Sequence, residues 1–127
     1  MNWLVAVFII GALVGAILIL PGSYSADLSR IGNGTRAVVL VHDTGLAPSI
    51  DLMHAVDQLR DEFEGRVQFL VADVRTESGK RFAHDHGVGA VTLVFFDASG
   101  KTLSMLHGVQ APPKLRQAFD TALGSTQ

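Results

Sequence analysis

The feature that most constrains the fold is a run of apolar, largely β-branched residues at positions 37–42, Ala-Val-Val-Leu-Val-His. A short continuous run of this kind predicts a strand that is buried on both faces. A second run follows at residues 67–73, and apolar residues recur at helical spacing between the two runs, at Leu52, Val56, Leu59 and Phe63. Two strands joined by a helix are predicted to be parallel, so this part of the chain is expected to form an α/β domain.

The rest of the domain is predicted to contain a helix, a hairpin and a final helix. A short polar helix is expected over residues 77–86, with Thr76 as its N-cap and Gly87 as its end. Two strands joined by a glycine-containing loop, and then a helix, are expected over residues 92–97, 102–107 and 112–123. The predicted order is β-α-β-α-β-β-α, which gives a four-stranded mixed sheet with helices on both faces.

An apolar segment precedes this domain. Residues 3–20 contain no charged residue and no proline, and a helix of that length spans nearly the roughly 30 Å of bilayer hydrocarbon. We therefore predict a transmembrane helix over residues 1–21, a linker over residues 22–35 and the globular domain over residues 36–127. A cleaved signal peptide is the alternative. The absence of Lys or Arg before the apolar run, and the length of that run, both argue against it.

The predicted membrane helix suggests how this chain meets its partners. Gly11 and Gly15 are four residues apart on one helix face, a spacing that lets a second helix approach closely. The membrane and other membrane protein subunits are therefore the expected partners. Arg30 and Arg36 follow the helix and favour a cytoplasmic domain by the positive-inside rule. The net charge of −2 gives no support to nucleic-acid binding.

The turn after the first strand contains the most informative residues, because the chain has no cysteine. It reads Thr44-Gly45-Leu46-Ala47-Pro48-Ser49 and leads into the predicted amphipathic helix. Several features of the chain resemble the thioredoxin-like fold family. They are the turn itself, the order of elements, the segment 69–74, and the Gly-Val and Val-Thr-Leu sequences within residues 87–93. That family carries a Trp-Cys-Gly-Pro-Cys redox motif in this turn. The resemblance covers essentially everything after the linker.

The resemblance also implies that the redox machinery has been lost. Leu46 and Ser49 stand where the family has its two cysteines, and thiol exchange needs a thiolate and a resolving thiol. Leu40 falls where the family has a buried acidic residue, and Val91 falls where it has a cis-proline. We therefore expect no enzyme activity, no cofactor and no small-molecule substrate. The degenerate active-site surface, defined as Leu46, Ala47, Pro48, Ser49 and Val91, is instead expected to bind a partner.

Other polar residues are assigned structural roles. Ser49 is expected to cap the helix rather than act as a nucleophile, since no Ser/His/Asp arrangement is indicated. His84 and His86 are expected to face solvent at a helix end rather than bind a metal. The charged residues of the first helix are expected to face away from the core; they include Asp57, Arg60, Asp61 and Glu64.

These observations predict a membrane-anchored, non-catalytic module that acts as an accessory or assembly subunit of a larger membrane complex. A chaperone-like module that binds peptides in the old active-site groove is the alternative, and an enzyme of unrecognised chemistry is a third. Resemblance to tethered thioredoxin-like domains favours an extracytoplasmic domain, against the two arginines that favour the cytoplasm. The side of the membrane stays open at this point.

Overall fold

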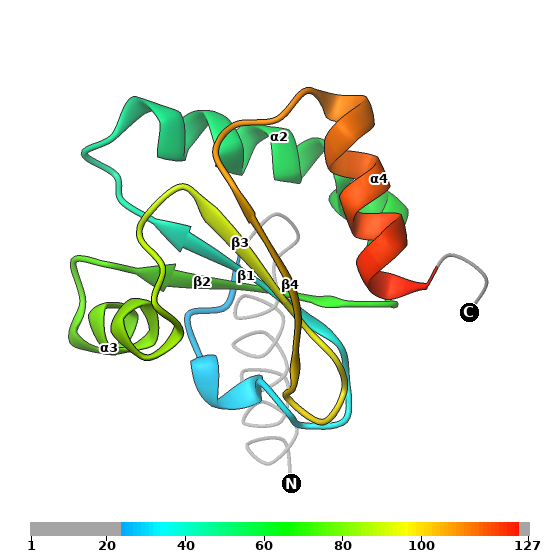
Figure 1. Ribbon diagram of the computed structural model, residues 1–127, viewed down its shortest axis with the longest axis horizontal. Helices are drawn as coiled ribbons and strands as arrows, with labels where there is room; N and C mark the ends of the chain where they lie inside the picture. The colour runs from blue at the N-terminus through cyan, green and yellow to red at the C-terminus, as the bar shows by residue number, and fades with distance from the viewer. Residues whose placement is uncertain (1–23, 125–127) are drawn as a thin grey trace, which may run out of the picture.

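The computed structural model describes residues 24–124, which form one sheet with helices on both faces (Figure 1). The elements are η1 (Leu28–Arg30), β1 (Ala37–His42), α2 (Ala47–Phe63), β2 (Gln68–Asp73), α3 (Glu77–His86), β3 (Thr92–Phe96), β4 (Thr102–His107) and α4 (Pro112–Leu123). The strand order is β2-β1-β3-β4, with β1 parallel to β2 and the other pairs antiparallel. The predicted order of elements and the four-stranded mixed sheet are confirmed.

The sheet separates two hydrophobic cores. Because side chains alternate along a strand, β1 directs Val38 and Leu40 toward the face covered by α2 and α4. It directs Val39 and Val41 toward the other face, which α3 and η1 cover. Every residue of β1 is buried, as the apolar run predicts. Phe119 of α4 anchors the first core, where its ring lies 5.1 Å from the ring of Phe63 and, almost at right angles, 5.1 Å from that of Phe95.

The predicted ends of α3 are also confirmed. The Thr76 hydroxyl accepts a hydrogen bond from the backbone N–H of Gly79 at 3.1 Å, which satisfies a donor that the first helical turn leaves free. Gly87 ends the helix in the left-handed conformation, with φ of 64°, a region that glycine occupies without steric cost. Local sequence thus determines both ends of this helix.

The segment expected to be a linker packs against the domain from residue 24 onward. Ser25 forms an isolated parallel bridge to Leu70, so it extends the sheet beyond the free edge of β2. Its carbonyl accepts a hydrogen bond from the N–H of Val71 at 2.9 Å. Leu28 and Ile31 pack on the second core. Much of the predicted linker is therefore a folded covering of the sheet.

Tyr24 joins this segment to α2. Its hydroxyl donates a 2.7 Å hydrogen bond to Asp57, and the Arg60 guanidinium lies 4.6 Å from the centre of its ring. The same guanidinium lies 5.4 Å from the ring of Phe69. The prediction that Arg60 faces solvent is wrong: its side chain is only 15% exposed, because its guanidinium group lies against the aromatic rings of Tyr24 and Phe69.

The predicted transmembrane helix over residues 1–21, with Gly11 and Gly15, lies outside the described residues. Between residues 24 and 124, no helix has both the length and the apolar character needed to cross a bilayer.

Candidate functional site

The candidate site lies at the end of the sheet where β1 passes into α2. The N-cap of α2 is Leu46, which has an extended backbone and makes no capping hydrogen bond with its side chain. Ala47 and Pro48 are the first two helical residues, where the missing N–H of proline costs no helical hydrogen bond. Leu46, Ala47 and Pro48 are all exposed. Leu46, which the resemblance places at the family's first cysteine position, is therefore a solvent-facing side chain.

Ser49 is completely buried, and the prediction that it caps α2 is wrong. It is the third residue of the helix, and its side chain contacts the end of β1 rather than the free N–H groups of the first turn. Its hydroxyl oxygen accepts a hydrogen bond from the N–H of Asp43 at 2.9 Å and lies 2.7 Å from Nδ1 of His42. The hydroxyl is thus enclosed by the fold and has no access to a substrate.

Val91, at the position of the family's cis-proline, has an unusual backbone conformation. Its φ is +63°, which makes it the only non-glycine residue with positive φ between residues 24 and 124. No peptide bond in this range is cis. The Val91 N–H donates to the carbonyl of Val41 at 2.9 Å, and its own carbonyl accepts from Gly108 at 2.8 Å. Both main-chain polar groups are therefore used within the fold.

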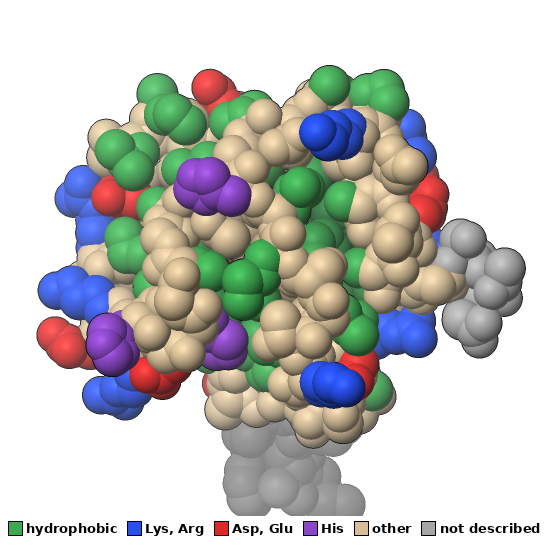
Figure 2. Space-filling model, in the orientation of Figure 1, with side chains coloured by type: hydrophobic (Ala, Val, Ile, Leu, Met, Phe, Trp, Pro, Cys, Tyr) green, Lys and Arg blue, Asp and Glu red, His purple; other side chains and the backbone are tan. Residues whose placement is uncertain are grey.

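Exposed apolar side chains occur around this end of the sheet. Leu46 is 44% exposed, Ile50 is 39% exposed one helical turn later, and Val109, which follows Gly108, is 47% exposed. Figure 2 shows hydrophobic side chains over the first turns of α2. We call Leu46, Ile50 and Val109 the apolar end surface. Sequence analysis missed Ile50 and Val109, although Ile50 lies off the buried stripe of α2 and four residues after Leu46.

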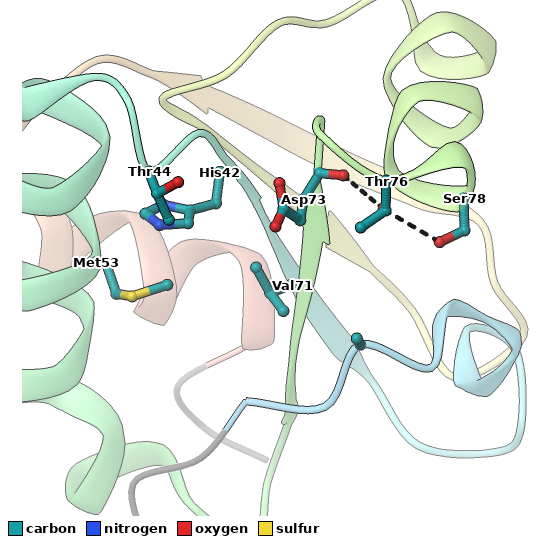
Figure 3. A pocket seen from close by; sticks show the side chains of 8 residues that line it. His42, Thr44, Met53, Val71, Asp73, Thr76 and Ser78 are labelled. Atoms are coloured by element: carbon teal, nitrogen blue, oxygen red, sulfur yellow. Dashed lines mark hydrogen bonds between the residues drawn. The ribbon is translucent and has the colours of Figure 1, made fainter.

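A separate pocket of about 420 Å³ opens on the α2 side of the sheet, at the carboxyl ends of β1 and β2 (Figure 3). Its lining combines polar and apolar side chains: Ala26, His42, Thr44, Met53, Val71, Asp73, Thr76 and Ser78. His42 and Asp73 are direct neighbours in the register of β1 and β2, so their side chains lie on the same face. The sequence analysis missed this pocket, since only the register of the two strands pairs these residues.

An ion pair borders the pocket. Nε of Arg75 lies 2.8 Å from the carboxylate of Asp43, which also accepts a 2.8 Å hydrogen bond from the N–H of Gly45. The hydrogen bond from Arg75 is the main cause that holds the pKa of Asp43 below its ordinary value. The backbone N–H of Arg75 also donates to the carboxylate of Asp73 at 2.9 Å. Asp43 is therefore paired closely with the Arg75 side chain, whereas Asp73 accepts a hydrogen bond only from the Arg75 main chain and interacts with the guanidinium at longer range.

The histidines of α3 differ from the prediction in one respect. His86 is half-buried rather than fully solvent-facing: its ring lies 4.1 Å from that of Phe82 and 5.4 Å from that of Phe96. Its Nδ1 is 2.9 Å from the carbonyl oxygen of Phe82. His84 is exposed and lies 3.6 Å from Asp85. No group of three or more His, Cys, Asp or Glu side chains in the described range is arranged to hold a metal ion.

Comparisons with known proteins show the fold and nothing finer. No protein-family model and no curated protein matches the sequence. One similar solved chain belongs to a study of the thiol resolving mechanism in yeast mitochondrial 1-Cys peroxiredoxin via glutathione/thioredoxin systems. It has a TM-score of 0.66 and 20% sequence identity, over 78% of this chain and 95% of that one. The domain of the present chain therefore has a thioredoxin-like fold.

Proposed function

We propose that this chain is a non-catalytic, membrane-anchored thioredoxin-like module that acts as an accessory or assembly subunit of a membrane protein complex. One observation carries the proposal. The end of the sheet where the fold family holds its redox motif presents the apolar end surface of Leu46, Ile50 and Val109. Exposed large apolar side chains at the same end of a domain are typical of surfaces that bind another protein.

The chemistry of the site supports a non-catalytic role. Thiol exchange requires a thiolate, and the chain has no cysteine. Ser49, the only hydroxyl at a former cysteine position, is buried and already bonded to His42 and Asp43. A nucleophile must reach its substrate, so this serine is not suited to replace the lost thiol.

The subunit role is favoured over peptide binding in the old groove. A groove that binds an extended peptide uses free main-chain donors and acceptors along its edge. At Val91 both of these groups are bonded within the fold, to Val41 and Gly108. Side-chain contacts through Leu46 and its apolar neighbours are therefore the main means of recognition at this end, which suits a partner with a fixed complementary surface.

The docked segment also supports a subunit close to the membrane. If residues 1–21 span the bilayer, only residues 22 and 23 separate that helix from Tyr24, which is held by Asp57 and Arg60. Two or three extended residues reach only about 7–11 Å. The domain would then lie beside the membrane surface, where it can contact the same partner that packs against Gly11 and Gly15.

Co-purification of the full chain in mild detergent tests the proposal. Leu46→Asp introduces a charge into the apolar end surface and also supplies a better N-cap for α2, so it should not unfold the domain. We expect this variant to lose most of the partner while staying in the membrane fraction. Replacing Gly11 and Gly15 with Leu should weaken the association and leave insertion unchanged.

The matched control is Met105→Asp, because Met105 is apolar and similarly exposed but lies on the edge strand β4. It should retain the partner. The proposal is contradicted if Leu46→Asp co-purifies with the same proteins, in the same amounts, as the wild-type chain.

A further inference from the structure

The pocket at the ends of β1 and β2 has the position and the size expected of a ligand-binding site. Parallel α/β sheets bind ligands beyond the carboxyl ends of their strands, which is where this pocket lies. Its volume of about 420 Å³ is within the range of small-ligand pockets. Figure 3 shows His42 and Met53 on one side of the space and Asp73 and Val71 on the other.

His42 offers a hydrogen-bond donor to this pocket. No other acceptor for the Ser49 O–H occurs among residues 24–124, so we assign its proton to the hydrogen bond with Nδ1 of His42. That network assigns the proton of the neutral imidazole to Nε2. The residue is 6% exposed, and no partner for Nε2 occurs among residues 24–124. The fold thus holds the ring rigidly by one nitrogen and leaves the other for a ligand.

Asp73 offers a negative charge at the opposite side of the pocket. Its carboxylate accepts one hydrogen bond, from the N–H of Arg75. The Arg75 guanidinium attracts it only at longer range, because its close contact is with Asp43. None of the lining residues is Lys or Arg. The hydroxyl-bearing residues Thr44 and Ser78 also line the pocket. This lining suits a cation and repels an anion.

We propose that this pocket binds a primary ammonium group adjacent to a carbonyl, as found at the amino end of a peptide or in a small amino amide. The ammonium group pairs with Asp73, and the carbonyl oxygen accepts from Nε2 of His42. An apolar side chain of the ligand packs on Met53 and Val71. This site is distinct from the apolar end surface, and the proposal does not depend on the subunit role.

Titration of the full chain in mild detergent with L-leucinamide, followed by amide NMR spectra, tests the proposal. We expect saturable shifts confined to the carboxyl ends of β1 and β2, at concentrations up to roughly 50 mM, since a ligand this small binds weakly. N-acetyl-L-leucinamide, which lacks the charge, should bind at least about tenfold more weakly. Asp73→Asn keeps an acceptor for Arg75 and should cause a similar loss.

Asp61→Asn is the matched control, because it removes an exposed carboxylate from α2 outside the pocket, and it should bind as the wild-type chain does. Tighter binding of Leu-Ala-Ala amide than of leucinamide identifies a peptide amino end as the ligand, and equal binding identifies the small amino amide. The proposal is overturned if the acetylated compound binds equally well, or if leucinamide causes no shifts at the pocket. The comparison of leucinamide with N-acetyl-L-leucinamide uses only the wild-type chain. It therefore tests the proposal even if the Asp73→Asn variant is unstable.

Discussion

At Val91 the backbone conformation opposes the preference of the side chain. A β-branched residue at φ of +63° is strained by roughly 1–2 kcal/mol relative to its ordinary conformation. Hydrogen bonds from both sides, to Val41 and from Gly108, hold it there. The loop before β3 therefore keeps a trans peptide bond and a left-handed conformation at residue 91.

Two variants test this account of residue 91. Val91→Gly relieves the strain but loses a half-buried side chain, so the free energy of unfolding should stay within about 1 kcal/mol of the wild-type value. Val91→Pro should lower it by about 3 kcal/mol or more, because proline fixes φ near −65° and removes the N–H that donates to Val41. Urea unfolding of a chain that begins at Gly22 measures both. Equal stability of Val91→Pro and wild type would contradict the assigned conformation.

Tyr24 is the only tyrosine of the chain, so its ionisation can be followed alone. Burial, reinforced by the hydrogen bond to Asp57, raises its pKa far above the ordinary value of 10.0. A group with a raised pKa contributes stability that is complete below pH 10 and declines as the pH rises further. As the pH is raised, ultraviolet absorbance should detect the Tyr24 phenolate only at those pH values where circular dichroism shows that the domain has unfolded. Ionisation near pH 10 in a folded chain would mean that Tyr24 is not docked.

At the scale of elements, the contact between α3 and β2 depends on one glycine. A Cβ atom on Gly79 would lie 1.8 Å from the carbonyl oxygen of Asp73, a backbone atom that cannot turn aside. Gly79→Ala should therefore lower the free energy of unfolding by about 2–4 kcal/mol. Ser78→Ala, at the neighbouring exposed position, should change it by less than about 1 kcal/mol in the same urea titration. Similar effects of the two variants would show that α3 lies farther from β2.

The segment before β1 behaves as an element of the fold. Tyr24, Leu28 and Ile31 pack against the two cores, so a chain that begins at Arg36 loses these contacts. We expect it to be less stable than a chain that begins at Gly22 by about 2–4 kcal/mol. Thermal unfolding of both chains measures the difference. Equal stability would restore the interpretation of residues 24–35 as a mere linker.

Sequence alone predicts those parts of the fold that local rules determine. The apolar run of β1, the buried stripe of α2 and the two ends of α3 follow from periodicity and from capping residues such as Thr76 and Gly87. The docking of Tyr24 on α2 was not predictable in this way. Its partners Asp57 and Arg60 are more than thirty residues away along the chain, and on a helix in isolation they belong to a solvated face.

Sequence analysis is limited in the same way at the candidate sites. Leu46 could be placed at the start of α2 because a turn and a proline mark it, but the burial of Ser49 depends on how α2 lies over β1. The side chains of His42 and Asp73 come together only through the register between β1 and β2. A sequence pattern that contains no information about register cannot indicate that pocket.

At the scale of the whole molecule, the two ends of the domain differ in what they contact. The segment that begins at Tyr24 is attached to β2 through Ser25 and to α2 through Tyr24. The carboxyl end of β1 leads to the apolar end surface of Leu46, Ile50 and Val109. Our proposal is that this thioredoxin-like scaffold uses the apolar end surface to bind another protein.

The most direct test of this claim is site-specific photocrosslinking in intact membranes from the protein's own cells. A benzophenone side chain at position 46 should form one discrete adduct with a single membrane protein, whereas the same side chain at position 103, an exposed leucine of β4, should form none. The absence of an adduct at position 46, or the same adducts at both positions, would contradict the account.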